Sequence, residues 1–246
     1  MTGLWDVGKD PLTWDFAVYL ACVKTLGVDH VNFGIERPGP GKFRGAKLPP
    51  EVIAERRFDN ILKPLCELAG VAYSIGMEGM RHGFHLGDLN RVYAEHKTLW
   101  KYVPMTDSGK RGYVTITLRE SFRKTFRNSN IEAWYRVAAE IGKDKPVIVL
   151  QDCEYKPMPV AQRMELYAHA DMNLSVSNGP AALLYLSEAP YLVFNMIPHM
   201  DERRIYEQHL SSGGFGIGSQ FDFRNERQAI VWDHDDYEVI MKAYHE

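Results

Sequence analysis

The chain has no apolar run long enough to cross a membrane, because no window of its 246 residues approaches 18 uninterrupted apolar residues. Its first ten residues, MTGLWDVGKD, lack the basic run and the apolar stretch of a secretory signal. Three cysteines, Cys22, Cys66 and Cys153, lie far apart and form no CxxC pair. This odd, scattered set argues against a disulfide framework and against a structural zinc site. We therefore expect a protein of the cytoplasm, a reducing compartment, with no transmembrane segment.

The sequence also lacks an excess of one charge and several catalytic signatures. Its 29 lysines and arginines and 32 aspartates and glutamates give a formal net charge of −3. A protein that holds nucleic acid by its phosphates usually carries a basic excess, so we expect no nucleic-acid partner. The phosphate-loop pattern GxxxxGK[ST], the nucleophile elbow GxSxG and the metal signature HExxH are all missing. The sequence therefore gives no support for the enzyme classes that depend on these motifs.

The chain does have an ordinary globular composition, with 45% hydrophobic and 25% charged residues. At about 100–200 residues per domain, its length allows one large domain or two small ones. In the first half, strands predicted at 4–8, 28–35 and 71–76 alternate with helices predicted at 12–26 and 51–69. This β-α-β-α-β order is typical of a parallel sheet with right-handed crossovers.

The second half repeats this alternation more clearly. Strands are predicted at 113–118, 146–150, 172–177 and 190–195, and helices at 131–142, 159–170, 178–188, 201–210 and 235–246. Residues 77–110 show no clear period, so we place a domain boundary at their end and divide the chain into 1–108 and 109–246. We expect an α/β protein with two Rossmann-like parallel-sheet domains, doubly wound and facing a cleft.

Ligands of open α/β sheets bind beyond the carboxyl ends of the strands, so the loops at those ends hold the candidate site residues. Arg119 and Arg127 follow the strand at 113–118. A guanidinium can hold a phosphate through two parallel hydrogen bonds, and we predict both arginines to bind an anion. The alternative is a solvated loop whose charges pair with Glu120 and Glu132.

The strand at 172–177 ends in a tight polar turn, Ser177-Asn178-Gly179, followed by Pro180. Ser177 or Asn178 can cap the next helix, and Gly179 lets a ligand approach the backbone closely. The free N–H groups at a helix start favour an anion, so we predict these three residues to bind one. The alternative is a well-capped helix that binds nothing.

Asp10 follows the first predicted strand and is our candidate general base, because a carboxylate on a loop at the mouth of a cleft can accept a proton. The alternative is that Asp10 only caps a helix that begins at Pro11. Asp6 and Asp15 are the fallback carboxylates. His82 and His85 lie three residues apart, but a metal needs three or four converging ligands, so we predict no metal site.

The second half resembles the donor-binding domain of GT-B glycosyltransferases. The segment ADMNLSVSNGPAALLYLSEAPYLVFN is similar to the heptosyltransferases in its strand, Gly-Pro turn, helix and following strand. Those enzymes have Asp-Ser-Gly-Pro followed by Met-His, whereas Ala181 and Ala182 follow Pro180 here. YVTITLRES and FRNSN resemble the arginine-bearing first loop of such domains. The resemblance covers about residues 110–246 and extends only loosely to the first half.

This resemblance implies a compact GT-B-like glycosyltransferase that moves a sugar from a nucleoside diphosphate sugar to an unknown hydroxyl acceptor. The donor would lie on the second half, with its diphosphate near Ser177, Asn178 and Gly179 and near Arg119 or Arg127. Such enzymes need no bound metal or other cofactor, and Asp10 would deprotonate the acceptor. The alternatives are a non-catalytic nucleotide-binding or sugar-binding protein of the same fold and a sugar-nucleotide epimerase.

Overall fold

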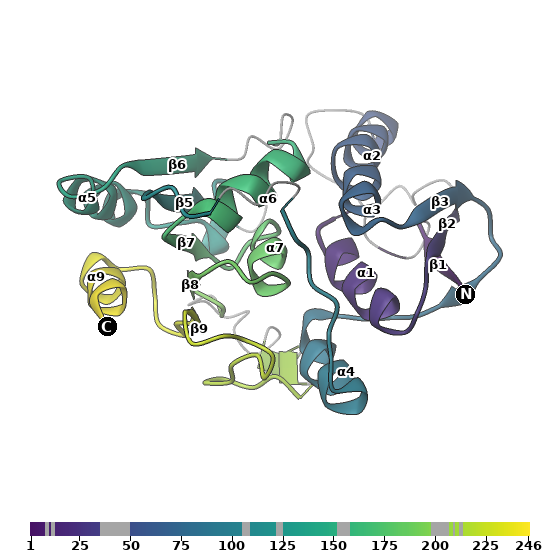
Figure 1. Cartoon of the computed structure of the whole chain (residues 1–246). Helices are drawn as coiled ribbons and strands as arrows, with labels where there is room; N and C mark the ends of the chain where they lie inside the picture. Colours follow the sequence, from purple (N-terminus) through teal and green to yellow (C-terminus); the bar gives the residue numbers. More distant parts are fainter. Residues whose placement is uncertain are drawn as a thin grey trace.

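Two sheets, each made only of parallel strands, form the framework of the molecule (Figure 1). The computed structural model describes residues 1–7, 10, 13–34, 50–104, 109–121, 125–151, 158–197, 207–208, 210–211 and 214–246. The α/β class predicted from the alternating pattern is confirmed. Within these residues, no helix is both long and apolar enough to cross a membrane.

The first sheet comes from the first half of the chain and has the strand order β3-β2-β1-β4. Its strands are β1 (Thr2–Asp6), β2 (His30–Gly34), β3 (Ala72–Ile75) and β4 (Met80–Arg81). The helices of this half are α1 (Asp15–Thr25), α2 (Pro50–Arg57), a π-helical segment (Phe58–Leu62), α3 (Lys63–Ala69), a 3-10 turn (Leu86–Asp88) and α4 (Leu89–His96).

The second sheet comes from the second half and has the strand order β6-β5-β7-β8-β9. Its strands are β5 (Val114–Leu118), β6 (Val147–Gln151), β7 (Met172–Val176), β8 (Tyr191–Phe194) and β9 (Gln228–Ile230). The helices of this half are a 3-10 turn (Thr125–Arg127), α5 (Ile131–Ile141), α6 (Val160–His169), α7 (Ala181–Tyr185) and α9 (Tyr237–His245).

Several elements differ from the sequence prediction. β4 and β9 were not predicted, because strands of two or three residues carry too little periodicity. α4 was also not predicted, although Leu89, Val92 and Tyr93 have helical spacing. The helix predicted at 51–69 continues through Pro64, which lies in the first turn of α3 directly after the π-helical segment. That position tolerates proline, since its missing N–H has no required partner there. Of the helix predicted at 201–210, residues 207, 208 and 210 are helical, and 201–206 and 209 lie outside the described part.

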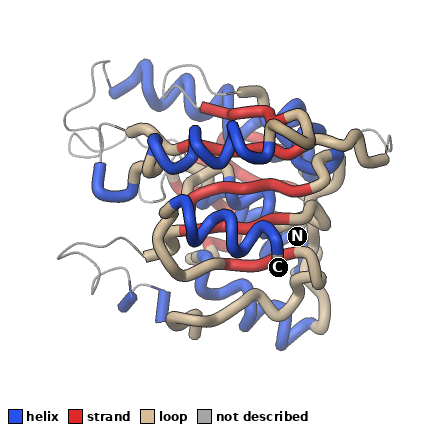
Figure 2. Tube along the Cα trace, turned by 90° about the vertical axis from the view of Figure 1, so that its left-hand side faces the viewer, coloured by secondary structure: helices blue, strands red, loops and turns tan. Residues whose placement is uncertain are grey.

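The second sheet is doubly wound, as predicted. Leu118, Val176 and Phe194 face the cluster that α5 and α9 complete, whereas Tyr191 and Val193 face the other core cluster, which includes residues of α6 and α7. In Figure 2, α9 lies in front of the strands and ends at the C-terminus. Helices therefore cover both faces of this sheet.

In the part of the chain that the structure describes, helices cover one side of the first sheet only, which departs from the predicted doubly wound arrangement. Figure 1 shows α1, α2 and α3 on the same side of β1, β2 and β3. The return from β3 to β4 has only residues 76–79 and no helix. These residues run close over the sheet: a Cβ on Gly79 would lie 2.9 Å from the carbonyl oxygen of Gly3, and one on Gly34 would lie 2.6 Å from Sδ of Met77. Glycine at these positions permits the short crossover.

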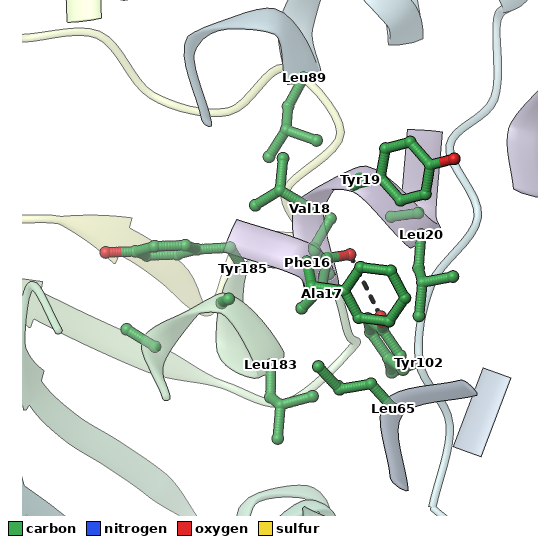
Figure 3. Close-up of a cluster of buried hydrophobic side chains, with 14 of the residues drawn as sticks. Phe16, Ala17, Val18, Tyr19, Leu20, Leu65, Leu89, Tyr102, Leu183 and Tyr185 are labelled. Carbon is green, nitrogen blue, oxygen red and sulfur yellow. Dashed lines mark hydrogen bonds between the residues drawn. The ribbon is translucent and has the colours of Figure 1, made fainter. Parts of the chain in front are cut away.

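One hydrophobic core joins the two halves of the chain. All eight residues from Phe16 to Val23 of α1 are buried, which is typical of a helix covered on every side. Figure 3 shows Leu183 of α7 on the same side as Phe16 and Leu65 of the first half, and all three belong to one cluster of buried side chains. The predicted boundary between 108 and 109 separates the strands of the two sheets, but the division into two domains stays a prediction.

The segment that connects the halves is part of this shared core. Tyr102 Oη donates to the carbonyl oxygen of Ala17 at 3.1 Å, and the Tyr102 N–H donates to that of Leu186 at 2.6 Å. The Trp100 N–H donates to Oγ1 of Thr25 at 2.9 Å. The connection is thus bonded to α1 on one side and to the end of α7 on the other.

Truncation of the shared core should destabilise both sheets together. We expect Leu183→Ala to lower the free energy of unfolding by about 2–5 kcal/mol, because Leu183 is fully buried between the halves. The control Val103→Ala, at a side chain 60% exposed, should stay within about 0.5 kcal/mol. Urea unfolding followed by tryptophan fluorescence and far-ultraviolet circular dichroism should give one coincident transition. Two separate transitions would show that the halves unfold independently.

Candidate functional site

Each sheet has one position where the strand order reverses, and ligands of open α/β sheets bind beyond the carboxyl ends of the strands at that position. In the first sheet, β1 lies between β2, which follows it in the sequence, and β4, which is the last strand of the sheet in the sequence. In the second sheet, β5 lies between β6 and β7. The two candidate sites are therefore the loops after β1 and β4, called the first switch point, and the loops after β5 and β7, called the second switch point.

The second switch point contains the residues predicted to bind an anion. Arg119 follows β5 and Ser177 follows β7, and these strands pair in parallel register. Arg127 Nη2 donates to the carbonyl oxygen of Ser177 at 3.0 Å. The structure thus brings Arg127 from the loop after β5 to the turn after β7. This contact has no local sequence signal, because 50 residues separate its partners.

The loop after β5 is closed at its base by reciprocal bonds. The Arg119 N–H donates to Oγ of Ser129 at 2.8 Å, and the Ser129 N–H donates to the carbonyl oxygen of Arg119 at 2.9 Å. Asn128 exchanges two hydrogen bonds with the backbone of Ser121. These bonds fix the backbone on both sides of residues 122–124, which lie outside the described part.

The turn after β7 caps a short helix and packs against the first half. Asn178 Oδ1 accepts from the Ala181 N–H at 3.0 Å, as the capping alternative predicts. The close approach expected at Gly179 is made by a side chain, because a Cβ there would lie 2.8 Å from Cγ of Trp14. Helix α7 has only five residues, so its dipole is smaller than that of a long helix.

The longer helix at the second switch point, α5, already has a carboxylate at its N-terminus. Asp235 accepts from the Asn130 N–H and from Nε1 of Trp134, each at 2.7 Å. Asp235 is buried, and Asn130 also caps the helix through the Ala133 N–H. Asp235 was not among the predicted site residues, because its contacts join segments more than 100 residues apart in the sequence. Its buried bonds to α5 give Asp235 a structural role.

Asp10 lies at the first switch point, but it does not cap α1 as the alternative interpretation predicts. Helix α1 begins at Asp15, with Trp14 at the N-cap position and no side-chain cap. Asp10 instead forms an ion pair with Arg81, the last residue of β4: Nη2 lies 2.6 Å from Oδ1, and Nε lies 3.3 Å from Oδ2. Oδ2 also accepts from the Asp6 N–H at 2.9 Å.

Arg81 is the functional candidate that sequence reasoning missed. Its side chain is 43% exposed, whereas that of Asp10 is 12% exposed. The hydrogen bonds to Asp10 raise the pKa of Arg81 above its ordinary value. No local pattern could reveal the pair, because 71 residues separate its members and β4 has only two residues.

The two switch points meet at Trp14 and Gly179. Trp14 precedes α1, and Gly179 belongs to the turn after β7. Asp10 lies four residues before Trp14, so their Cα atoms are at most about 15 Å apart. Ser177, which Arg127 contacts, lies two residues before Gly179. The Asp10–Arg81 pair and the Arg127–Ser177 contact therefore flank one junction between the halves.

The histidines considered as metal ligands have other contacts. The His85 backbone N–H donates to Oδ2 of Asp88 at 2.8 Å as part of a capping box. The His82 ring stacks on Phe84, with centroids 5.3 Å apart. Across the described ranges, no three histidine, cysteine, aspartate or glutamate side chains converge on a metal position. Cys22 and Cys66 are free and buried, and burial raises the pKa of both thiols to about 12.

In comparisons with known proteins, the chain matches no family model, no curated protein and no solved structure.

The close contact between Trp14 and Gly179 leads to a testable prediction about stability. Gly179→Ala should cost about 1–3 kcal/mol of stability, because the added methyl group overlaps the Trp14 ring. The control Gly216→Ala, where no atom lies within 4 Å of the new methyl group, should be neutral or slightly stabilising. In a Trp14→Ala background, Gly179→Ala should lose most of its cost, with a coupling energy of about 0.5–3 kcal/mol in urea unfolding. Additive effects would mean that the two residues do not touch.

Proposed function

We propose that the chain is a glycosyltransferase that moves a sugar from a nucleoside diphosphate sugar to a hydroxyl acceptor. The donor would bind at the second switch point and the acceptor at the first. The observation that carries this proposal is the contact of Trp14 with Gly179, which brings together the loops at the carboxyl ends of two parallel sheets. A transferase needs such an arrangement because its two substrates must meet. The compact GT-B-like form suggested by the sequence is part of this proposal.

Arg119 and Arg127 would hold the diphosphate of the donor. A guanidinium offers two parallel N–H groups to phosphate oxygens and stays charged at any physiological pH. As the sugar leaves, negative charge grows on the diphosphate, and a cation positioned beforehand stabilises that charge. Ser177, Asn178 and Gly179 would form the adjoining wall of the site. The proposed mechanism uses these side chains, with no metal or other cofactor.

Asp10 would accept the proton of the acceptor hydroxyl. The pair with Arg81 holds the Asp10 carboxylate in place in the loop after β1. The same pair favours a second candidate function, a non-catalytic nucleotide-binding or sugar-binding protein, since both oxygens of Asp10 already accept hydrogen bonds. Turnover distinguishes the two, because fold alone does not fix function.

The cytoplasmic location expected from the sequence belongs to the same proposal. Cys22 and Cys66 are free thiols, which is typical of proteins kept in a reducing compartment.

A nucleotide screen tests the donor site. We expect one of UDP, GDP, ADP or CMP, or a sugar conjugate, to raise the melting temperature selectively, since ligand at about 100 times Kd adds roughly 2.7 kcal/mol. Arg119→Ala should weaken that binding about tenfold or more without unfolding the chain. The control Arg136→Ala removes the same charge from the outer face of α5, where Arg136 lies over Tyr237, and should leave binding unchanged.

The outcomes separate the candidate functions. Absence of any nucleotide-dependent shift would contradict the donor site and with it the glycosyltransferase proposal. Binding without turnover, even with a range of acceptors, would favour the binding protein. Conversion of the sugar nucleotide without any acceptor would identify an epimerase. Loss of turnover with retained nucleotide binding in Asp10→Asn would support Asp10 as the base.

A further inference from the structure

We propose that Arg81 binds an oxyanion, a carboxylate or a phosphate, carried by the acceptor. This inference rests on the proposed function in one respect, because only a transferase has an acceptor substrate that could carry the oxyanion. The anion-binding role of Arg81 itself depends only on the geometry of the first switch point. Neither the sequence motifs nor the resemblance to glycosyltransferases pointed to this residue.

The position of Arg81 is the first argument. It is the last residue of β4 and pairs in parallel register with Leu4 of β1. Leu4 is the third of the five residues of β1, and the Arg81 guanidinium reaches Asp10 in the loop that follows β1. The guanidinium therefore lies beside the carboxyl end of β1, where the strand order of the first sheet reverses. Ligands of parallel sheets bind at this location.

The orientation of its guanidinium is the second argument. Asp10 holds Nε and Nη2 together, and the Asp6 N–H fixes the carboxylate in turn. Two contacts on one edge of a planar group define the direction of the other edge. Among the described residues, Nη1 has no assigned acceptor, and the side chain is 43% exposed. A fixed and accessible donor edge is therefore present.

A second arginine of the same chain shows what such an edge can hold. Arg91 of α4 uses Nη2 for Asp88 at 2.9 Å and Nη1 for Glu95 at 3.3 Å, so its guanidinium joins two carboxylates. Arg81 forms the first kind of contact with Asp10, and no described residue takes the second position. An oxyanion from a ligand would complete the same arrangement, with planar fork geometry that favours carboxylate or phosphate.

The nearby charges indicate the strength of such binding. Asp6 and Asp10 both lie close enough to favour the charged form of Arg81, so they also repel an incoming anion. We therefore expect weak, millimolar binding of a small free anion. The rest of the acceptor would supply the remaining affinity.

The test is an NMR titration of the whole protein labelled with nitrogen-15. Inorganic phosphate is the phosphate probe, and acetate is the carboxylate probe. The Nε–H resonance of Arg81, identified by its loss in Arg81→Lys, should shift and saturate with phosphate or acetate. The Nε–H resonance of Arg91 is the matched control and should show no saturable shift. Glycerol, a neutral polyol, should leave both resonances in place.

Variants locate the bound anion. With the Asp6 N–H as reporter, Arg81→Lys should weaken phosphate binding about tenfold, since lysine keeps the charge but loses the planar fork. Arg127→Ala, at the second switch point, should leave the Arg81 shift unchanged. An unchanged melting temperature of Arg81→Lys shows that the variant is folded.

Several results would overturn the inference. A non-saturable Arg81 shift equal to that of Arg91, a response to glycerol alone, or loss of the Arg81 response in Arg127→Ala would each contradict it. Loss of nucleotide binding in Arg81→Lys would place Arg81 in the donor site and also contradict it. Saturable phosphate binding at Arg81, with no nucleotide binding by the unaltered protein, would support the anion site while the glycosyltransferase proposal fails.

Discussion

The packing of Trp14 on Gly179 is the contact on which the arrangement of the candidate site depends. It places the start of α1, and so the carboxyl end of β1, against the turn after β7. Any larger residue than glycine would push the two ends apart. The same contact occupies the space that a ligand would need to reach the backbone of Gly179. A ligand at this junction must therefore lie beside Trp14 and contact side chains.

The shared core gives this junction a rigid support. Helix α1 is buried from Phe16 to Val23 and packs with residues of both halves, and Tyr102 bonds to both sides of the interface. Proteins with separate domains usually have smaller and more polar interfaces between them, which permits relative motion. Here the two switch points are held by the same apolar cluster. The distance between donor and acceptor sites would thus be set by folding, with little left for closure on binding.

Local patterns predicted most strands and helices but not the partners of the site residues. The buried β-branched run Val114–Leu118 and the amphipathic run Ile131–Ile141 each carry their own periodicity, so both elements were found. Asp10 was found as a candidate because it follows a strand. Its partner Arg81 was missed, because the two-residue strand β4 exists only through pairing with β1. Gly179 was recognised as a site of close approach, whereas the approaching group, Trp14, depends on packing between distant segments.

The position of Asp235 bears on how this fold would bind phosphate. Doubly wound domains commonly hold phosphate at a helix N-terminus, where free N–H groups and the dipole act together. In this chain, α5 has Asp235 at that place, and α7 is a single short turn capped by Asn178. Neither helix start offers a full set of free donors. The negative charge of a bound diphosphate would therefore be neutralised mainly by the arginines of the loop after β5. Binding at such an arginine-based site on a surface loop would weaken as the salt concentration rises. A site of this kind would depend on arginine side chains and would not need a glycine-rich phosphate motif.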